Sequence, residues 1–195
     1  MLVRKLLPVL LSAVLAASAG TAAAASLQTL EAEMTIIGVE VEARPMVYVT
    51  GTATMSAIPS VTETAFSRLG QFLGTSGVVA LGPPMVVYHD WSADSTAVDV
   101  GVPVSAADAQ KAGGDVLAGM TPGGHALKVV HTGPYDDFPA TYAAIDAAMK
   151  DAGIPDSARM WEVYLNEPGT TAPADLVTEI YVAVSAADAA RFPGE

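Results

Sequence analysis

The chain carries apolar residues at three- and four-residue spacing in two stretches, and each stretch predicts a helix with one buried face. The first stretch has its apolar positions at Val61, Ala65, Leu69, Phe72 and Leu73. Ser60 and Glu63 have the spacing of a capping box at the start of this stripe, and Gly74 and Gly77 follow it as stop signals.

The second predicted helix has its apolar positions at Phe138, Tyr142, Ile145 and Met149. Asp136 or Asp137 is expected to cap it, with Pro139 in the first turn, where a missing N–H costs nothing. Gly153 is expected to end it.

Strands are predicted where β-branched residues are frequent and apolar positions alternate with polar ones. In the first half they cover 39–51, broken at Pro45, and a hairpin of 85–90 with 96–104. In the second half they cover 125–132 and a hairpin of 160–166 with 175–184. Each half therefore has the order strand, helix, strand, strand.

The two halves also share sequence. Residues 104–109 read Val-Ser-Ala-Ala-Asp-Ala, and the same six residues recur at 184–189, an offset of 80. Val87 and Tyr88 fall on Val163 and Tyr164 at an offset of 76. Such a repeat predicts two copies of one unit, covering about 39–104 and 125–184, with 105–124 as a surface crossover.

Because each helix has one apolar face, a sheet must cover it. We therefore expect an α+β fold of duplicated βαββ units with pseudo-twofold symmetry. The sheet should be antiparallel, with both helices on one face and a ligand cleft on the other.

Residues 1–25 are expected to lie outside this fold as a secretory signal peptide. Arg4 and Lys5 precede a short apolar run, and the alanines at 22–25 offer a signal peptidase site, with cleavage after Ala25 favoured over Ala24. An uncleaved membrane anchor fits less well, because a span needs about 20 apolar residues. The expected organisation is a signal peptide at 1–25, a linker at 26–36, and one exported domain at 37–195, periplasmic or secreted.

Charge and composition exclude several classes of function. The net charge is −12, which disfavours nucleic acid as a partner. No cysteine is present, so disulfides and thiol chemistry are excluded. His89, His125 and His131 have no metal-ligand spacing, and no cofactor-binding motif occurs. After signal cleavage no membrane insertion is expected, and the sequence leaves the oligomeric state open.

The alternation of strand faces singles out five residues as candidate ligand contacts. In the last strand Glu179 and Tyr181 share the face opposite the core residues. Glu162 and Tyr164 share one face of the preceding strand, and Tyr88 is the first-half equivalent of Tyr164. If these side chains enclose one cavity, a cationic apolar ligand would offset the buried charge. The alternative is that both carboxylates lie on a solvated sheet face.

Four strings of residues resemble the GyrI-like small-molecule-binding domain, the effector-binding domain of bacterial transcription activators. They lie at 82–90, 131–135, 161–166 and 178–182, and the resemblance extends over about 37–185. It implies two βαββ units around a central cleft that binds lipophilic, often cationic, compounds. In the family, an acidic residue followed two positions on by tyrosine is tied to ligand contact; Glu179 with Tyr181 matches this, and Glu162 with Tyr164 has the same spacing.

The function expected from the sequence is an exported, stand-alone binding protein for small hydrophobic or cationic molecules. Relatives of this fold are commonly fused to a DNA-binding domain, and too few residues separate the predicted signal peptide from the first strand to form one. The main alternative is a small-molecule hydrolase in which Glu179 is the general base and a tyrosine donates the proton. A third is a partner-binding module of the cell envelope.

Overall fold

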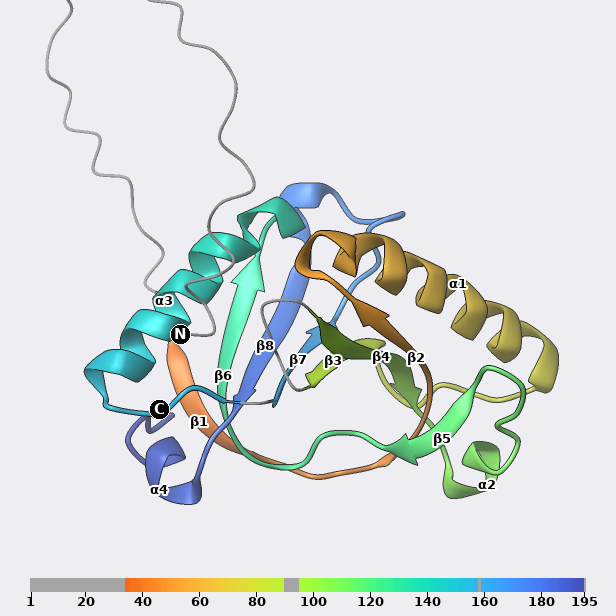
Figure 1. Cartoon of the computed structure of the whole chain (residues 1–195), viewed down its shortest axis with the longest axis horizontal. Coiled ribbons are helices and arrows are strands. Elements are labelled where there is room, and N and C mark those ends of the chain that lie inside the picture. The colour runs from red at the N-terminus through yellow and green to blue at the C-terminus, as the bar shows by residue number, and fades with distance from the viewer. Residues whose placement is uncertain (1–33, 90–94, 158, 195) are drawn as a thin grey trace, which may run out of the picture.

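A computed structural model describes residues 34–89, 95–157 and 159–194. The predicted signal peptide lies outside the described residues. The described chain forms one eight-stranded antiparallel sheet in the order β1-β6-β8-β7-β3-β4-β2-β5, and the two long helices cover one side of it (Figure 1). The α+β class and the antiparallel sheet are as predicted.

The strands are β1 (Ile36–Val41), β2 (Pro45–Ala53), β3 (Met85–His89), β4 (Thr96–Pro103), β5 (Leu117–Met120), β6 (Gly124–Thr132), β7 (Arg159–Tyr164) and β8 (Val177–Ala183). The helices are α1 (Ile58–Ser76), α2 (Ala106–Ala109), α3 (Phe138–Asp151) and α4 (Ala186–Ala189). Single 3₁₀ turns cover η2 (Met55–Ala57), η3 (Tyr135–Asp137) and η4 (Pro173–Asp175). Among the described residues, no helix is long and apolar enough to cross a membrane.

Both long helices form where the apolar stripes predict them, but α1 begins earlier than its capping box. The helix starts at Ile58, with a proline in its first turn, and the Ser60 hydroxyl donates to the carbonyl of Ala57 at 3.0 Å. The predicted cap at Ser60 is therefore wrong, because that residue already lies within the helix. Gly77 ends α1 in the left-handed conformation, with φ of 67°.

The α3 helix ends as its sequence predicts. Gly153 has a φ of 64°, and the N–H of Ile154 donates to the carbonyl of Met149 at 2.8 Å. Asp137 stands at the N-cap position, but its side chain makes no capping hydrogen bond there. Proline in the first turn, rather than a side-chain cap, marks the start of this helix.

The first predicted strand, 39–51, divides into two strands that lie far apart in the sheet. β1 pairs with β6, whereas β2 pairs with β4 and β5. The predicted surface crossover at 105–124 is also wrong in part, since it contains α2 and β5. Sequence order does not predict this pairing. β1 does not pair with β2, the next strand in the chain, but with β6, and β5 does not pair with β6 but with β2.

The pairing registers repeat at the offset seen in the sequence. Ile37 of β1 lies opposite Lys128 of β6, and Leu117 of β5 lies opposite Tyr48 of β2, a shift of 80 in both strands. The first strand of each half thus pairs with the second strand of the other half. Two copies of one unit would produce this arrangement, and the duplication itself stays a prediction.

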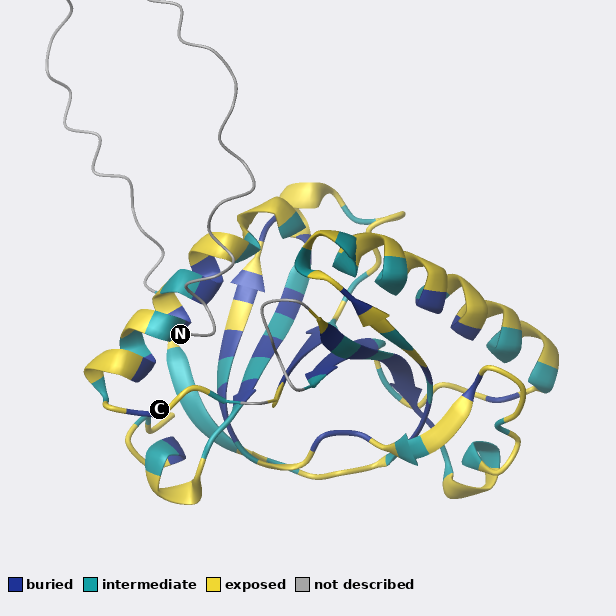
Figure 2. Cartoon of the chain, viewed as in Figure 1, coloured by how far each residue is buried: buried dark blue, intermediate teal, exposed yellow. Residues whose placement is uncertain are grey.

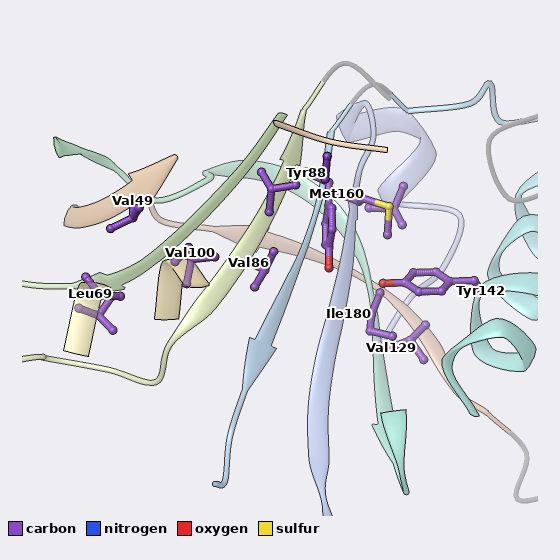
Figure 3. Packing of buried hydrophobic residues seen from close by; sticks show 14 of the residues in the cluster. Val49, Leu69, Val86, Tyr88, Val100, Val129, Tyr142, Met160 and Ile180 are labelled. Carbon is purple, nitrogen blue, oxygen red and sulfur yellow. The ribbon is translucent and has the colours of Figure 1, made fainter. Parts of the chain in front are cut away.

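The sheet is apolar on both faces. On the helix side, side chains from the central strands and both helices form the main core (Figure 3). Figure 2 shows the buried residues of these strands and helices in dark blue. Its fully buried members include Val47, Val86, Val100, Leu127, Ile145 and Ile180. A second cluster covers the opposite, concave face with Met46, Met85, Val87, Ala126, Trp161 and Val163.

Two linkers cross the concave face opposite the helices (Figure 1). The Arg44 N–H donates to the Thr121 hydroxyl at 2.9 Å, and the Thr121 N–H donates to the Arg44 carbonyl at 2.8 Å. Residues 42–44 and 121–124, called the strap below, are joined by these bonds. Cavities of about 420 Å³ and 440 Å³ share Thr121 and Pro122 of the strap in their walls.

Candidate functional site

A buried carboxylate lies on the helix side of the sheet. Glu162 on β7 is opposite Val86 of β3 and Ile180 of β8, and its exposed fraction is 3%. Three tyrosine hydroxyls donate to it: Tyr88 from β3 at 3.0 Å, Tyr142 from α3, and Tyr164 from β7. Figure 3 shows the Tyr88 and Tyr142 hydroxyls pointing to the same place beneath α3. These four residues are called the Glu162 cluster.

The electrostatics of the Glu162 cluster follow from its burial. Burial raises the pKa of the Glu162 carboxyl, while hydrogen bonds from the tyrosines and the nearby His131 act in the opposite direction. Burial and the Glu162 charge raise the pKa of the Tyr88, Tyr142 and Tyr164 hydroxyls well above their usual value. The tyrosines therefore stay protonated and donate.

Within the described part of the chain, no lysine or arginine forms an ion pair with Glu162. The hydrogen bonds satisfy the carboxylate oxygens but do not cancel its charge. An ionised group that is buried in this way is costly unless a cation or a proton joins it.

Aromatic rings from both helices surround the Glu162 cluster. Phe66 of α1 and Tyr135 of η3 contact the Tyr164 ring edge-to-face, with centroids 5.9 Å and 5.6 Å away. Phe138 of α3 contacts the Tyr142 ring at 6.0 Å. Phe66, Tyr135 and Phe138 are partly exposed, so they form the boundary between the cluster and solvent.

One buried polar atom beside this cluster has no hydrogen-bond partner among the described residues. It is the Thr178 hydroxyl on β8, a residue that is only 1% exposed. Thr178 is opposite Tyr164 of β7 and His131 of β6. An unpaired buried hydroxyl is uncommon in proteins, and it marks a place where a further polar group would be favourable.

The second candidate carboxylate, Glu179, lies on the concave face. It lines the cavity of about 440 Å³ with Tyr181, Lys128 and Trp161. The Tyr181 hydroxyl donates to Glu179 at 2.7 Å, and the ring of Tyr181 stacks on Trp161 at 5.0 Å with an interplanar angle of 4°. Burial and this hydrogen bond raise the pKa of Tyr181.

Glu179 already has a cationic partner. The Lys128 ammonium forms an ion pair with its carboxylate and lies 5.8 Å from the centre of the Tyr181 ring. Lys128 thus occupies the place that a ligand cation would take, between a carboxylate and an aromatic face.

The structure separates the five residues that the sequence predicts to share a cavity. Glu179 and Tyr181 face the concave groove as expected. The placement of Glu162, Tyr164 and Tyr88 beside them is wrong, because these three lie on the helix side.

The wrong assignment of Glu162 and Tyr164 arises in β7. Both faces of this strand are buried, so its apolar residues do not show which face is turned towards the helices. The pairing of Trp161 with Tyr181 fixes the orientation and brings Trp161 into the groove. The apolar stripe of α3 predicts Tyr142 as a core residue, and nothing in that pattern indicates its hydrogen bond to Glu162. Antiparallel pairing of β7 with β8 was the signal that places Trp161 correctly.

Within the described residues, no group of three histidine, aspartate or glutamate side chains is placed to hold a metal ion.

Comparison with known proteins identifies the family. A profile of the GyrI-like small molecule binding domain matches residues 34–185, most of the chain. The chain belongs to the GyrI-like family. No curated protein matches the sequence significantly.

Solved structures of GyrI-like fold resemble this domain at low sequence identity. The EcmrR C-terminal domain is 20% identical with a TM-score of 0.64, over 78% of this chain and 98% of that one. SAV2435 bound to tetraphenylphosphonium is 13% identical with a TM-score of 0.57, over 80% of this chain and 96% of that one. A hydrolase from Listeria innocua is 13% identical with a TM-score of 0.50, over 77% and 92% of the two chains. At these identities the likeness establishes the shared fold.

Proposed function

We propose that this GyrI-like domain binds small lipophilic cations. The family is a small-molecule-binding one, and a neighbour of the same fold is bound to tetraphenylphosphonium. The observation that carries the proposal is Glu162, a buried carboxylate among aromatic rings with no lysine or arginine partner in the described chain. A cation with apolar substituents supplies the missing charge without needing hydration, and the rings add cation–π attraction.

Glu162 fits this role better than Glu179, the residue that the sequence places first. A ligand cation at Glu179 must displace Lys128 from an ion pair and from the Tyr181 ring. At Glu162 it displaces no charged group, and it recovers the cost of burying the carboxylate. In this proposal Glu162 is the main counter-charge, with Tyr88 and Tyr164 as walls of its site. Glu179 and Tyr181 form a separate surface in the groove.

Entry to the Glu162 cluster requires the partly exposed rings to move. Phe66 comes from α1, whereas Tyr135 and Phe138 come from the start of the α3 segment, so the boundary is shared by two helices. Parting these rings opens a route between the helices without breaking the sheet. The unpaired Thr178 hydroxyl at the same place gives a ligand one more polar contact.

Calorimetric titration with tetraphenylphosphonium tests the site. Glu162→Gln keeps the side-chain shape but removes the charge, and it should weaken binding by about 1.5–3 kcal/mol, roughly 10- to 100-fold. Glu179→Gln is the matched control, and it should change the affinity by less than about threefold. A protonated Glu162 cannot supply the negative charge, so the affinity of the wild-type protein for the cation should decrease as the pH is lowered. Binding of the cation should release a proton from the fraction of Glu162 that is protonated.

The same titration separates the rival assignments. A large loss in Glu179→Gln with none in Glu162→Gln places the cation in the concave groove. Unchanged affinity for tetraphenylphosphonium in both variants rules out a carboxylate as the recognition element. So does a neutral analogue, such as 4-tritylbenzamide, that binds the wild-type protein as tightly as tetraphenylphosphonium does.

A second candidate function is hydrolysis in the groove. Glu179 and the Tyr181 hydroxyl lie 2.7 Å apart at the wall of an open cavity, which places a base and a proton donor side by side. Turnover of an activated ester that disappears in Glu179→Gln, while tetraphenylphosphonium affinity stays unchanged, would support an enzyme at that site. Equal turnover in the variant would exclude Glu179 as the base.

Export is also part of the proposal. The basic start, the apolar run and the alanine tract in residues 1–25 should direct the chain across the membrane and then be removed. N-terminal sequencing of protein from the culture medium or periplasm should give a start at Ser26 or Ala25. Recovery of the full chain, beginning at Met1, in the membrane fraction would contradict cleavage.

A further inference from the structure

Most of the basic residues that the structure describes are paired with carboxylates. Of nine lysines and arginines, all but Arg4 and Lys5 lie within the described residues. Five of these form ion pairs with carboxylates: Arg68, Lys111, Lys128, Lys150 and Arg191. For Arg44 and Arg159, the described chain has no carboxylate at ion-pair distance, and both line cavities beside the strap.

Arg159 lies in the cavity of about 420 Å³, next to a histidine that is held in place. It is directly opposite His89 on the neighbouring strand, and both side chains line this cavity. The His89 Nε2 is 2.8 Å from Asp99 Oδ2, so one oxygen of this carboxylate is engaged by the imidazole, and Asp99 also lines the cavity. Among the described residues, no carboxylate forms an ion pair with the Arg159 guanidinium, although it lines this cavity.

The remaining walls of the cavity are largely apolar. Met46 and Val87 belong to the buried cluster on the concave face, and the Tyr48 ring packs closely on the backbone of Gly119. The strap closes one side of the cavity with Ala43 and residues 121–124, which have short side chains or none. An apolar floor beside a guanidinium that has no ion-pair partner among the described residues suits a molecule with an apolar body and one anionic end.

From this arrangement we infer that the cavity beside Arg159 binds small aromatic carboxylates. The planar guanidinium of Arg159 matches a carboxylate in a two-bond fork. The apolar body lies against Met46, Val87 and the Tyr48 ring. This site is on the opposite face of the sheet from the Glu162 cluster, and it takes ligands of the opposite charge.

The test uses 2-naphthoate and its neutral counterpart 2-naphthamide, titrated by calorimetry into the full domain. Wild-type protein should bind 2-naphthoate roughly tenfold more tightly than 2-naphthamide. Arg159→Gln should remove this preference, with the 2-naphthamide affinity unchanged. Arg159 is exposed, so this variant should keep its fold, which circular dichroism checks.

Arg44→Gln is the matched control, since Arg44 also lacks an ion pair within the described residues and lines the cavity on the other side of the strap. It should alter 2-naphthoate affinity by less than about threefold, as should Glu162→Gln. Equal affinity of the wild type for both probes, no binding of 2-naphthoate, or equal losses in the two arginine variants would overturn the inference. Loss of tetraphenylphosphonium binding in Glu162→Gln is a separate result, so the failure of one proposal does not imply failure of the other.

Discussion

Glu162→Ala is expected to lower the free energy of unfolding by about 3 kcal/mol, measured by urea denaturation at neutral pH. Three tyrosine hydroxyls donate to this carboxylate, and Tyr88 and Tyr142 are themselves buried. Alanine removes their acceptor and leaves a cavity, and both effects destabilise the fold. A side chain without hydrogen-bonding groups is therefore much worse here than the charged one, despite the cost of burying a charge.

Glu162→Gln separates the charge from the hydrogen bonds. Glutamine keeps an acceptor oxygen, and it removes an ionised group whose burial disfavours the charged form. At neutral pH its unfolding free energy should be within about 1 kcal/mol of the wild-type value, or above it. A loss as large as that of the alanine variant would show that the charge itself stabilises the cluster.

The pH dependence of this difference has a defined sign. Because the pKa of Glu162 is raised in the folded state, the folded protein binds this proton more tightly than the unfolded chain. Wild type should therefore gain stability relative to Glu162→Gln as the pH falls through the folded pKa towards the ordinary glutamate value. Measuring both proteins at each pH cancels the contributions of the other carboxylates. A difference that stays constant with pH would contradict a raised pKa.

The sequence predicts the helices and the antiparallel sheet because local patterns decide them. The stripe of Val61, Ala65 and Leu69 has only one way to be buried, and Gly77 and Gly153 end their helices through backbone conformations that glycine favours. The exchange of β1 and β5 between the halves leaves no such local trace. The exchange depends on whether β1 and β5 pair with the edge of β2 or of β6. These two edges offer equivalent pairing registers, offset by 80 residues, so the local sequence does not distinguish them.

The candidate site was half predictable for a related reason. In β8 one face is apolar and the other carries Glu179 and Tyr181, so alternation assigns the faces correctly. In β7, Trp161 faces a second apolar cluster under the strap while Glu162 is buried among tyrosines. Hydrophobicity then points to the wrong face, and only the pairing with β8 resolves it. The link between Tyr88 and Tyr164 at an offset of 76 was the better guide, since both hydroxyls reach Glu162.

The exchanged strand β1 depends on one glycine, and Gly38→Ala should lower the free energy of unfolding by about 3 kcal/mol. Gly38 lies opposite Leu127 of β6, and its N–H donates to the carbonyl of Phe192 at 2.6 Å. A Cβ at this position would be 1.9 Å from the carbonyl oxygen of Ala189, which belongs to the backbone of α4. Because neither backbone can yield locally, either β1 or the segment around α4 must move away.

Gly70→Ala is the matched control for this prediction. Gly70 is an exposed position within α1, where a Cβ meets no atom within 4 Å. The same substitution there should stabilise the protein by about 0.5–1 kcal/mol, since alanine loses less conformational freedom in a helix. Hydrogen exchange should locate the Gly38→Ala effect in β1, α4 and the adjoining edge of β6, with the amides of β3 and β4 protected as in wild type. If Gly38→Ala instead unfolds at the wild-type urea concentration, α4 does not rest on β1, and the sheet edge there is open.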